Sequence, residues 1–165
     1  MNDADFDVVP FDTRDRSGFC CGVPALDRYF QIQIGQDIRR DAARAYLAVD
    51  WRSNRIAGYY TLAAAEIPLQ DLPESDRRRL PQYTSIPAVR LGRLAVDVAF
   101  RARKLGSVLL FDAAQRAHAS GIGVFALIVD AKNSDAAAFY QYHGLTAYGS
   151  APNQMFAPLK RLLAP

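Results

Sequence analysis

The chain has 165 residues, of which 50% are hydrophobic and 22% charged, and this size and apolar content favour one compact domain over two. Its longest apolar stretches, such as residues 121–129, fall well short of the ~20 residues needed to cross a bilayer. The acidic start, residues 1–7, lacks the basic region of a signal peptide. We therefore expect a single cytoplasmic domain over residues 1–165, with no membrane association.

Charge is unevenly distributed along the chain. Residues 1–76 carry 8 basic and 13 acidic side chains, whereas residues 77–104 carry 8 basic and 1 acidic, a net charge of +7. This concentration favours a polyanionic partner, although a solvated basic surface remains an alternative. The only cysteines, Cys20 and Cys21, are adjacent and too few for a structural zinc site, so we expect buried thiols and no metal.

The first half of the chain predicts a helix, a hairpin and a long loop. Proline at position 24 suits a first helical turn, and apolar residues recur at helical spacing over residues 26–34. Residues 45–49 and 56–65 are apolar and β-prone, and the polar residues 50–55 between them predict an antiparallel hairpin. Residues 68–87 contain prolines and three consecutive arginines, which is typical of a functional loop with a short helix inside.

The second half predicts alternating strands and helices. A strand is expected over residues 88–96, a helix with a broad apolar face over 106–119, and a buried strand over 121–129. A short helix over 134–142 and a last strand over 154–159 follow. Together these elements predict an α/β fold whose mixed, mostly antiparallel central sheet is flanked by helices on both faces.

A basic turn that contains glycine joins the strand 88–96 to the following helix. Free backbone N–H groups and the helix dipole at such a turn are suited to holding phosphates. The glycine spacing is neither that of a Walker loop nor that of a Rossmann fingerprint. An anion site is thus predicted here, and a plain basic connection is the alternative.

This turn resembles the R/Q-x-x-G-x-G/A loop of the GNAT superfamily, with Arg101 and Gly106 at its ends and Lys104 in place of the inner glycine. The resemblance implies a GNAT fold and an N-acetyltransferase that uses acetyl-CoA as co-substrate. Because lysine tolerates positive φ less well than glycine, we expect a slightly reshaped loop whose ammonium could meet a phosphate. The residues implied in binding the pantetheine and pyrophosphate are Leu94, Ala95, Val96, Arg101, Ala102, Arg103, Lys104, Leu105, Gly106 and Ser107.

Residues 133–145 resemble a second segment of that superfamily, N-x-x-A-x-x-F-Y-x-x-x-G-F. Asn133 or Ser134 can cap the helix. The resemblance implies that Asn133, Ala136 and Phe139 contact the cofactor and that Tyr140, with a phenol pKa near 10, protonates the departing thiolate. An aromatic pair on a short helix is, taken alone, more often part of a core.

Five segments resemble more narrowly the GNAT toxins that acetylate the aminoacyl group of charged tRNA and are silenced by a ribbon-helix-helix antitoxin. They are residues 19–22, 26–30, 58–62, 87–97 and 156–160. The resemblance implies these two partners and a homodimer. Candidates for holding tRNA phosphates are Arg77, Arg78, Arg79, Arg90 and Arg93. Arg90 and Arg93 could instead be structural partners of Asp97 or of a helix end. An acetyltransferase for a small amine or protein N-terminus, and a non-catalytic binding module, remain alternatives.

Overall fold

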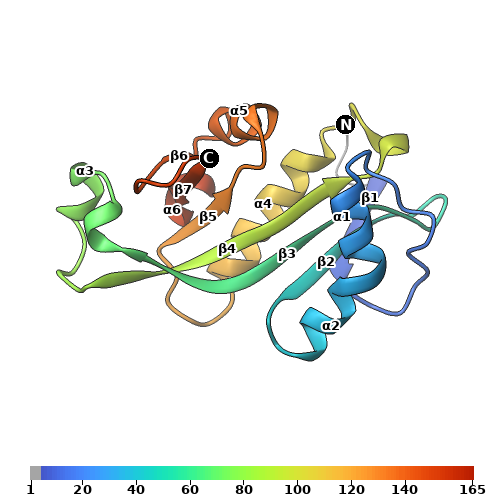
Figure 1. Ribbon diagram of the computed structural model, residues 1–165, viewed down its shortest axis with the longest axis horizontal. Coiled ribbons are helices and arrows are strands. Elements are labelled where there is room, and N and C mark those ends of the chain that lie inside the picture. The colour runs from blue at the N-terminus through green and yellow to red at the C-terminus, as the bar shows by residue number, and fades with distance from the viewer. Residues whose placement is uncertain (1–4) are drawn as a thin grey trace. The chain divides into compact units, whose positions relative to one another are not determined.

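The computed structural model describes residues 5–165, and its helices and strands are drawn in Figure 1. The strands are β1 (Phe6–Pro10), β2 (Arg44–Asp50), β3 (Arg55–Pro68), β4 (Ser85–Val96), β5 (Ala126–Asp130), β6 (Thr146–Ala147) and β7 (Gln154–Pro158). They follow the order β1-β2-β3-β4-β5-β7-β6 in one sheet. Strands β4 and β5 pair in parallel, whereas the pairs β1–β2, β2–β3, β5–β7 and β6–β7 are antiparallel. This mixed sheet confirms the predicted α/β class.

Helical segments connect most of the strands. They are α1 (Pro24–Arg28), the π-helical turn η2 (Tyr29–Gln33), α2 (Ile34–Arg39), the 3-10 turn η3 (Leu69–Asp71), α3 (Glu74–Arg77), the 3-10 turn η4 (Val98–Phe100), α4 (Leu105–His118), α5 (Ser134–Tyr142) and α6 (Leu159–Leu162). The chain forms two compact parts, one of residues up to Ala63 with Gly92–Ala113, the other of Ala64–Leu91 with Ala114–Pro165.

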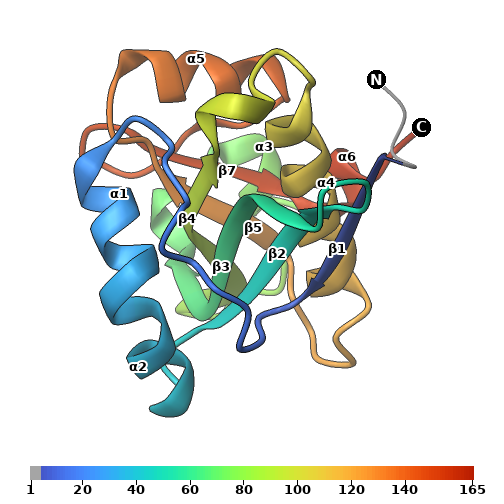
Figure 2. The ribbon, with the colours of Figure 1, turned by 90° about the vertical axis from the view of Figure 1, so that its right-hand side faces the viewer.

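In the first part, helical segments cover both faces of the β2–β3 hairpin. Tyr59 and Tyr60 are fully buried neighbours on β3 and therefore point to opposite faces. Tyr59 donates a hydrogen bond to the Leu26 carbonyl in α1, at 2.9 Å, and stacks on Phe30, with ring centroids 4.2 Å apart. Tyr60 donates to the carboxylate of Asp112 in α4. Figure 2 shows α1 and α2 on one side of this hairpin. The predicted hairpin and first helix are confirmed, with Pro24 in the first turn.

Strand β1 was not predicted from the sequence. It pairs antiparallel with β2 from Phe6 opposite Asp50 to Pro10 opposite Tyr46. Phe6 is buried, and its ring meets the ring of Phe100 edge to face at 5.9 Å. The strand is short and includes an aspartate and a proline, so its local pattern is weak, and the pairing with β2 stabilises it.

In the second part, the expected loop and strand have different limits. Strand β3 continues to Pro68 and β4 begins at Ser85, so the irregular segment is shorter than predicted, and the expected short helix within it is α3. The predicted strand 121–129 begins only at Ala126 and ends at Asp130, and Gly121 has a φ of +85°, which is not that of an extended strand. The two-residue strand β6 was also missed.

Two predicted absences concern membranes and metals. In the described part of the chain no helix is long and apolar enough to cross a membrane. Residues 5–165 also contain no group of three or more histidine, cysteine, aspartate or glutamate side chains placed to hold a metal ion. Cys21 is buried as expected, but Cys20 is exposed, so the prediction of two buried thiols was wrong for Cys20.

Candidate functional site

A buried carboxylate fixes the point at which β4 ends. Asp97 is only 2% exposed, and its side chain accepts hydrogen bonds from the backbone N–H groups of Cys20 at 3.0 Å and Ala99 at 2.8 Å. Its own N–H donates to the Ala57 carbonyl at 2.8 Å. A buried charge with several N–H donors is costly to remove. From its sequence Asp97 was predicted only as a partner for arginine, and this role was missed, although an aspartate directly after a strand is a typical turn-capping signal.

The predicted pantetheine strand, Leu94–Val96, precedes Asp97. Parallel pairing of β4 with β5 covers Ala88–Arg90, and β4 continues beyond these residues to Val96. Ala95 is buried, and its carbonyl oxygen would lie 2.9 Å from a Cβ atom placed on Gly58. Glycine at position 58 therefore allows β3 to approach the end of β4 closely.

The turn after η4 adopts left-handed backbone at two residues that are not glycine. Ala102 has a φ of +62° and Lys104 a φ of +58°. The loop therefore keeps at Lys104 the conformation that glycine would favour, and the prediction of a reshaped loop was wrong. A left-handed conformation costs a residue with a Cβ atom roughly 1–2 kcal/mol, so the turn is strained at both positions.

The first turn of α4 is suited to holding an anion. Its first helical hydrogen bond runs from the Val108 N–H to the Lys104 carbonyl, at 3.2 Å. The N–H groups of Leu105 and Gly106 precede that bond and have no carbonyl one turn back along the helix. No acidic residue lies in this turn, so the helix dipole attracts anions without competition from a local carboxylate.

The basic side chains of the turn have different environments. The Arg101 guanidinium donates to the Cys21 carbonyl at 2.7 Å. Arg103 lies over the ring of Phe6, with its guanidinium carbon 4.8 Å from the ring centroid, and 3.5 Å from Asp5. Lys104 is exposed and has no ion-pair partner in the part of the chain described. Arg101 and Arg103 therefore brace the turn, and Lys104 offers its ammonium group to an anion.

Helix α5 carries the predicted general acid. The Asn133 side chain accepts a hydrogen bond from the Ala136 N–H at 2.8 Å, which confirms the predicted cap. Tyr140 is 9% exposed, and burial raises its pKa to about 12, above the value near 10 that was predicted. The phenol therefore stays protonated at neutral pH.

The Tyr140 ring is held in place while its hydroxyl remains accessible. The Phe139 ring contacts it edge to face at 5.2 Å and also contacts His143 at 4.9 Å. No side-chain oxygen or nitrogen among the described residues is both enclosed and without a hydrogen-bond partner. The Tyr140 hydroxyl has no hydrogen-bond partner within residues 5–165, so it must be open to solvent or to a ligand.

Two of the five candidate arginines have structural partners. Arg90 forms an ion pair with Asp130 at 2.8 Å. The Arg93 guanidinium carbon lies 3.8 Å above the centroid of the Tyr29 ring, a distance typical of a cation–π contact. Neither arginine pairs with Asp97, which instead forms an ion pair with Arg55 at 3.9 Å. Both arginines thus have partners within the protein that were not predicted, and their contact with tRNA stays a prediction.

The other three candidates, Arg77, Arg78 and Arg79, lie together at the end of α3 and directly after it. Arg78 and Arg79 are exposed and Arg77 is half-buried. No ion-pair partner of theirs occurs within residues 5–165. These three cations are therefore available to an external anion.

Comparisons with known proteins agree with this geometry. Residues 12–145 match the acetyltransferase (GNAT) family. A probable toxin TacT of Sinorhizobium fredii (strain NBRC 101917 / NGR234) is 29% identical over 163 residues, which cover 92% of this chain and 90% of the relative. A tRNA-acetylating toxin of Mycobacterium tuberculosis (strain ATCC 25618 / H37Rv) is 36% identical over 131 residues, covering 78% of this chain and 76% of the relative.

Solved structures give the same picture. AtaT complexed with acetyl-methionyl-tRNAfMet has a TM-score of 0.85 and 28% identity, and the match covers 94% of this chain and 96% of AtaT. A mutant AtaT toxin bound to the C-terminus of the antitoxin AtaR and to acetyl-CoA has a TM-score of 0.79 and 25% identity, with 96% of each chain covered. Since the family match spans most of the chain and a curated relative shares 36% of its residues, the chain belongs to the acetyltransferase (GNAT) family.

Proposed function

We propose that this protein is the toxin of a toxin–antitoxin pair and that it transfers an acetyl group from acetyl-CoA to the α-amino group of an aminoacyl-tRNA. The observation that carries the proposal is the 36% identity to a tRNA-acetylating toxin over 78% of the chain. The exposed cations at residues 77–79 support an RNA acceptor, because phosphate contacts supply most of the affinity of such complexes. Charged tRNA as acceptor places the protein in the cytoplasm.

The start of α4 fits the pyrophosphate of acetyl-CoA. Backbone N–H groups without helical acceptors, a helix dipole free of local carboxylates and the Lys104 ammonium all favour an anion there. We assign the pantetheine to the backbone of Leu94–Val96 and its surroundings to Asn133, Ala136 and Phe139. The remaining proposed contacts are with Arg101, Ala102, Arg103, Lys104, Leu105, Gly106 and Ser107. When bound, acetyl-CoA supplies an acetyl group activated as a thioester.

Tyr140 is the proposed general acid. Its pKa of about 12 keeps the proton on the phenol until negative charge develops on the departing sulfur. A backbone N–H near Val96 is proposed to stabilise the charge that develops on the acetyl oxygen. The α-amine of an aminoacyl group has a reference pKa of about 7.7–8.0, so a substantial fraction of it is unprotonated between about pH 7 and 8 and no strong protein base is needed.

Partners and assembly complete the proposal. The binding of AtaT to the C-terminus of an antitoxin supports an antitoxin partner for this chain as well. We propose that this partner is a ribbon-helix-helix protein, that the toxin forms a homodimer, and that residues 1–165 act as a single acetyltransferase domain.

The test is incubation of the purified protein with radiolabelled acetyl-CoA and total charged tRNA, with uncharged tRNA, free amino acids and a short peptide as competing acceptors. Label should appear on charged tRNA only and should leave the RNA when mild base hydrolyses the aminoacyl ester. Faster labelling of the peptide or amino acids would favour the small-amine enzyme. No labelling of any acceptor would favour a non-catalytic module. Tyr140→Phe, which removes one oxygen atom, is the matched control.

A further inference from the structure

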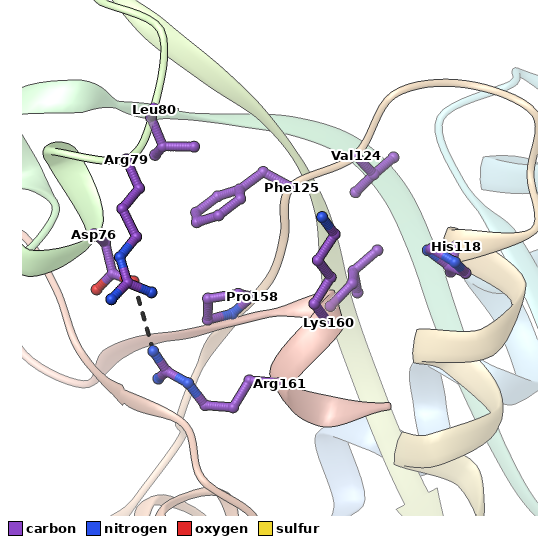
Figure 3. Close-up of a pocket in the computed structure, with 10 residues that line it drawn as sticks. Asp76, Arg79, Leu80, His118, Val124, Phe125, Pro158, Lys160 and Arg161 are labelled. Carbon is purple, nitrogen blue, oxygen red and sulfur yellow. Dashed lines mark ion pairs between the residues drawn. The ribbon is translucent and has the colours of Figure 1, made fainter. Parts of the chain in front are cut away.

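The second part of the chain contains a basic pocket that the acetyl-transfer site does not use. It has a volume of about 460 Å³, and its lining includes Asp76, Arg79, Phe125, Pro158, Lys160 and Arg161. The lining comes from the segment of α3, the residues before β5 and the junction of β7 with α6 (Figure 3). Pockets of roughly 300–1,000 Å³ are typical of sites for small molecules.

The charged side chains that line this pocket favour an anionic ligand. Three cationic side chains line it against the single carboxylate of Asp76, and that carboxylate already pairs with Arg161 at 3.5 Å. Asp76 is largely buried, with 16% of its side chain exposed. Arg79 and Lys160 have no ion-pair partner within residues 5–165. Two exposed cations are therefore free to contact an anionic ligand.

An aromatic ring lies between these cations. Figure 3 shows the ring of Phe125 between Leu80 and Pro158, with Arg79 to one side. The backbone of Phe125 is anchored twice, because its N–H donates to the Pro87 carbonyl and its carbonyl accepts from the Leu159 N–H, both at 2.9 Å. The ring is half-buried. It offers a fixed apolar surface beside two free positive charges.

We propose that this pocket binds a nucleoside 5′-phosphate. A phosphate carries up to two negative charges and three acceptor oxygens, which suits a guanidinium and an ammonium at one site, and a base can stack on an aromatic ring. An acidic peptide would satisfy the cations but leave the ring unused. The same chemistry occurs in a free mononucleotide and in one unit of single-stranded RNA. The inference goes beyond acetyl transfer and holds whether or not the acceptor is tRNA.

Titration calorimetry of the full chain with AMP tests the proposal. Saturating CoA is present throughout, so that AMP cannot occupy the site proposed for the acetyl donor. AMP should bind, while inorganic phosphate and adenosine should each bind at least roughly tenfold more weakly, because each makes only part of the contacts. Arg79→Gln should weaken AMP binding roughly 10- to 100-fold, the effect of losing a charged hydrogen bond. Arg39→Gln is the matched control, since it removes the same charge from an exposed arginine that lies outside both the lining and residues 77–79.

The remaining arms separate the sources of the ligand. If a 5′-phosphorylated trinucleotide binds more tightly than AMP, and Arg79→Gln weakens its binding, the natural ligand is RNA. If the trinucleotide does not bind while AMP does, the natural ligand is a free nucleotide. The proposal is overturned if AMP does not bind in the presence of saturating CoA, if Arg79→Gln and Arg39→Gln weaken AMP binding equally, or if an oligoglutamate peptide binds more tightly than AMP. The radiolabelling assay is independent of these measurements, so failure of the pocket and failure of the proposed function are distinguishable.

Discussion

Replacing Lys104 by alanine and by glycine separates the two effects of this residue. Lys104 has a φ of +58° and an exposed ammonium group beside the start of α4. Alanine removes the charge but keeps the Cβ atom, so the strain remains. Glycine removes both. Comparing Lys104 with alanine therefore reports on the ammonium, and comparing alanine with glycine reports on the backbone strain.

The magnitudes follow from the local structure. Replacing a left-handed residue that has a Cβ atom by glycine removes a strain of roughly 1–2 kcal/mol from the folded state. Glycine also makes the unfolded chain more flexible, which lowers the free energy of unfolding by roughly 0.4–1 kcal/mol. We expect Lys104→Gly to be more stable than Lys104→Ala by up to about 1.6 kcal/mol, and each kcal/mol raises the Tm by roughly 2–4 °C for a chain of this length. Loss of a phosphate contact by the exposed ammonium should weaken acetyl-CoA binding roughly 2- to 10-fold in both variants.

Thermal unfolding without ligand measures the first effect, and titration calorimetry with acetyl-CoA measures the second. Ala102→Gly is the matched control for strain, because Ala102 has a φ of +62° and no charge. It should raise the Tm without reducing cofactor affinity through a charge. Glycine forms that melt at a lower temperature than the corresponding alanine forms would refute the strained turn. Wild-type affinity in Lys104→Ala would refute the ammonium–phosphate contact.

Further predictions concern the general acid, the end of β4 and the basic segment. Tyr140→Phe should keep acetyl-CoA affinity and lower the rate of acetyl transfer roughly 10²- to 10⁴-fold, and an unchanged rate would remove Tyr140 from the mechanism. Since burial raises the pKa of Tyr140 to about 12, the folded state binds more protons than the unfolded state between about pH 10 and pH 12. The resulting contribution to the free energy of unfolding is complete below about pH 10 and is lost as the pH rises through that window. Urea denaturation of Tyr140→Phe at different pH values should lack this pH dependence. Asp97→Ala should destabilise the fold by about 2–4 kcal/mol by leaving two N–H groups without an acceptor, and urea denaturation showing less than about 1 kcal/mol would contradict this role. Neutralising residues 77–79 together should leave acetyl-CoA affinity intact and make the slope of log K for tRNA against log salt shallower by up to about one unit per lost contact; an unchanged slope would identify these arginines as solvated surface.

The elements that could be predicted from the sequence are those with strong local patterns. The β2–β3 hairpin, the helix that begins at Pro24, the strand that ends at Val96 and the Asn133 cap all depend on periodicity, turn residues or a short-range hydrogen bond. Such signals act over a few residues. The basic turn before α4 was likewise evident from spacing alone, and with it the expectation of an anion site.

Other features depend on residues far apart in the chain. Strand β1 exists because β2 pairs with it. The partner of Arg93 is Tyr29, and the carboxylate of Asp97 binds the N–H of Cys20, contacts that no local pattern indicates. The loop at Lys104 was predicted to change shape, yet Lys104 adopts the positive φ that suits glycine, and its carbonyl accepts a hydrogen bond from the Val108 N–H in the first turn of α4.

The sequence by itself determined most of the helices and strands, though not β1 or β6, and the residue types at the proposed cofactor site, because hydrophobic periodicity and capping are local. Only the tertiary structure decided which cations remain free. Arg90 pairs with Asp130, and Arg103 lies over the ring of Phe6. In contrast, Arg79 and Lys160 are 81 positions apart in the chain and line one pocket. The physical reason is that the chemistry of a charged side chain depends on burial and on its neighbours in space, and both are fixed by long-range packing.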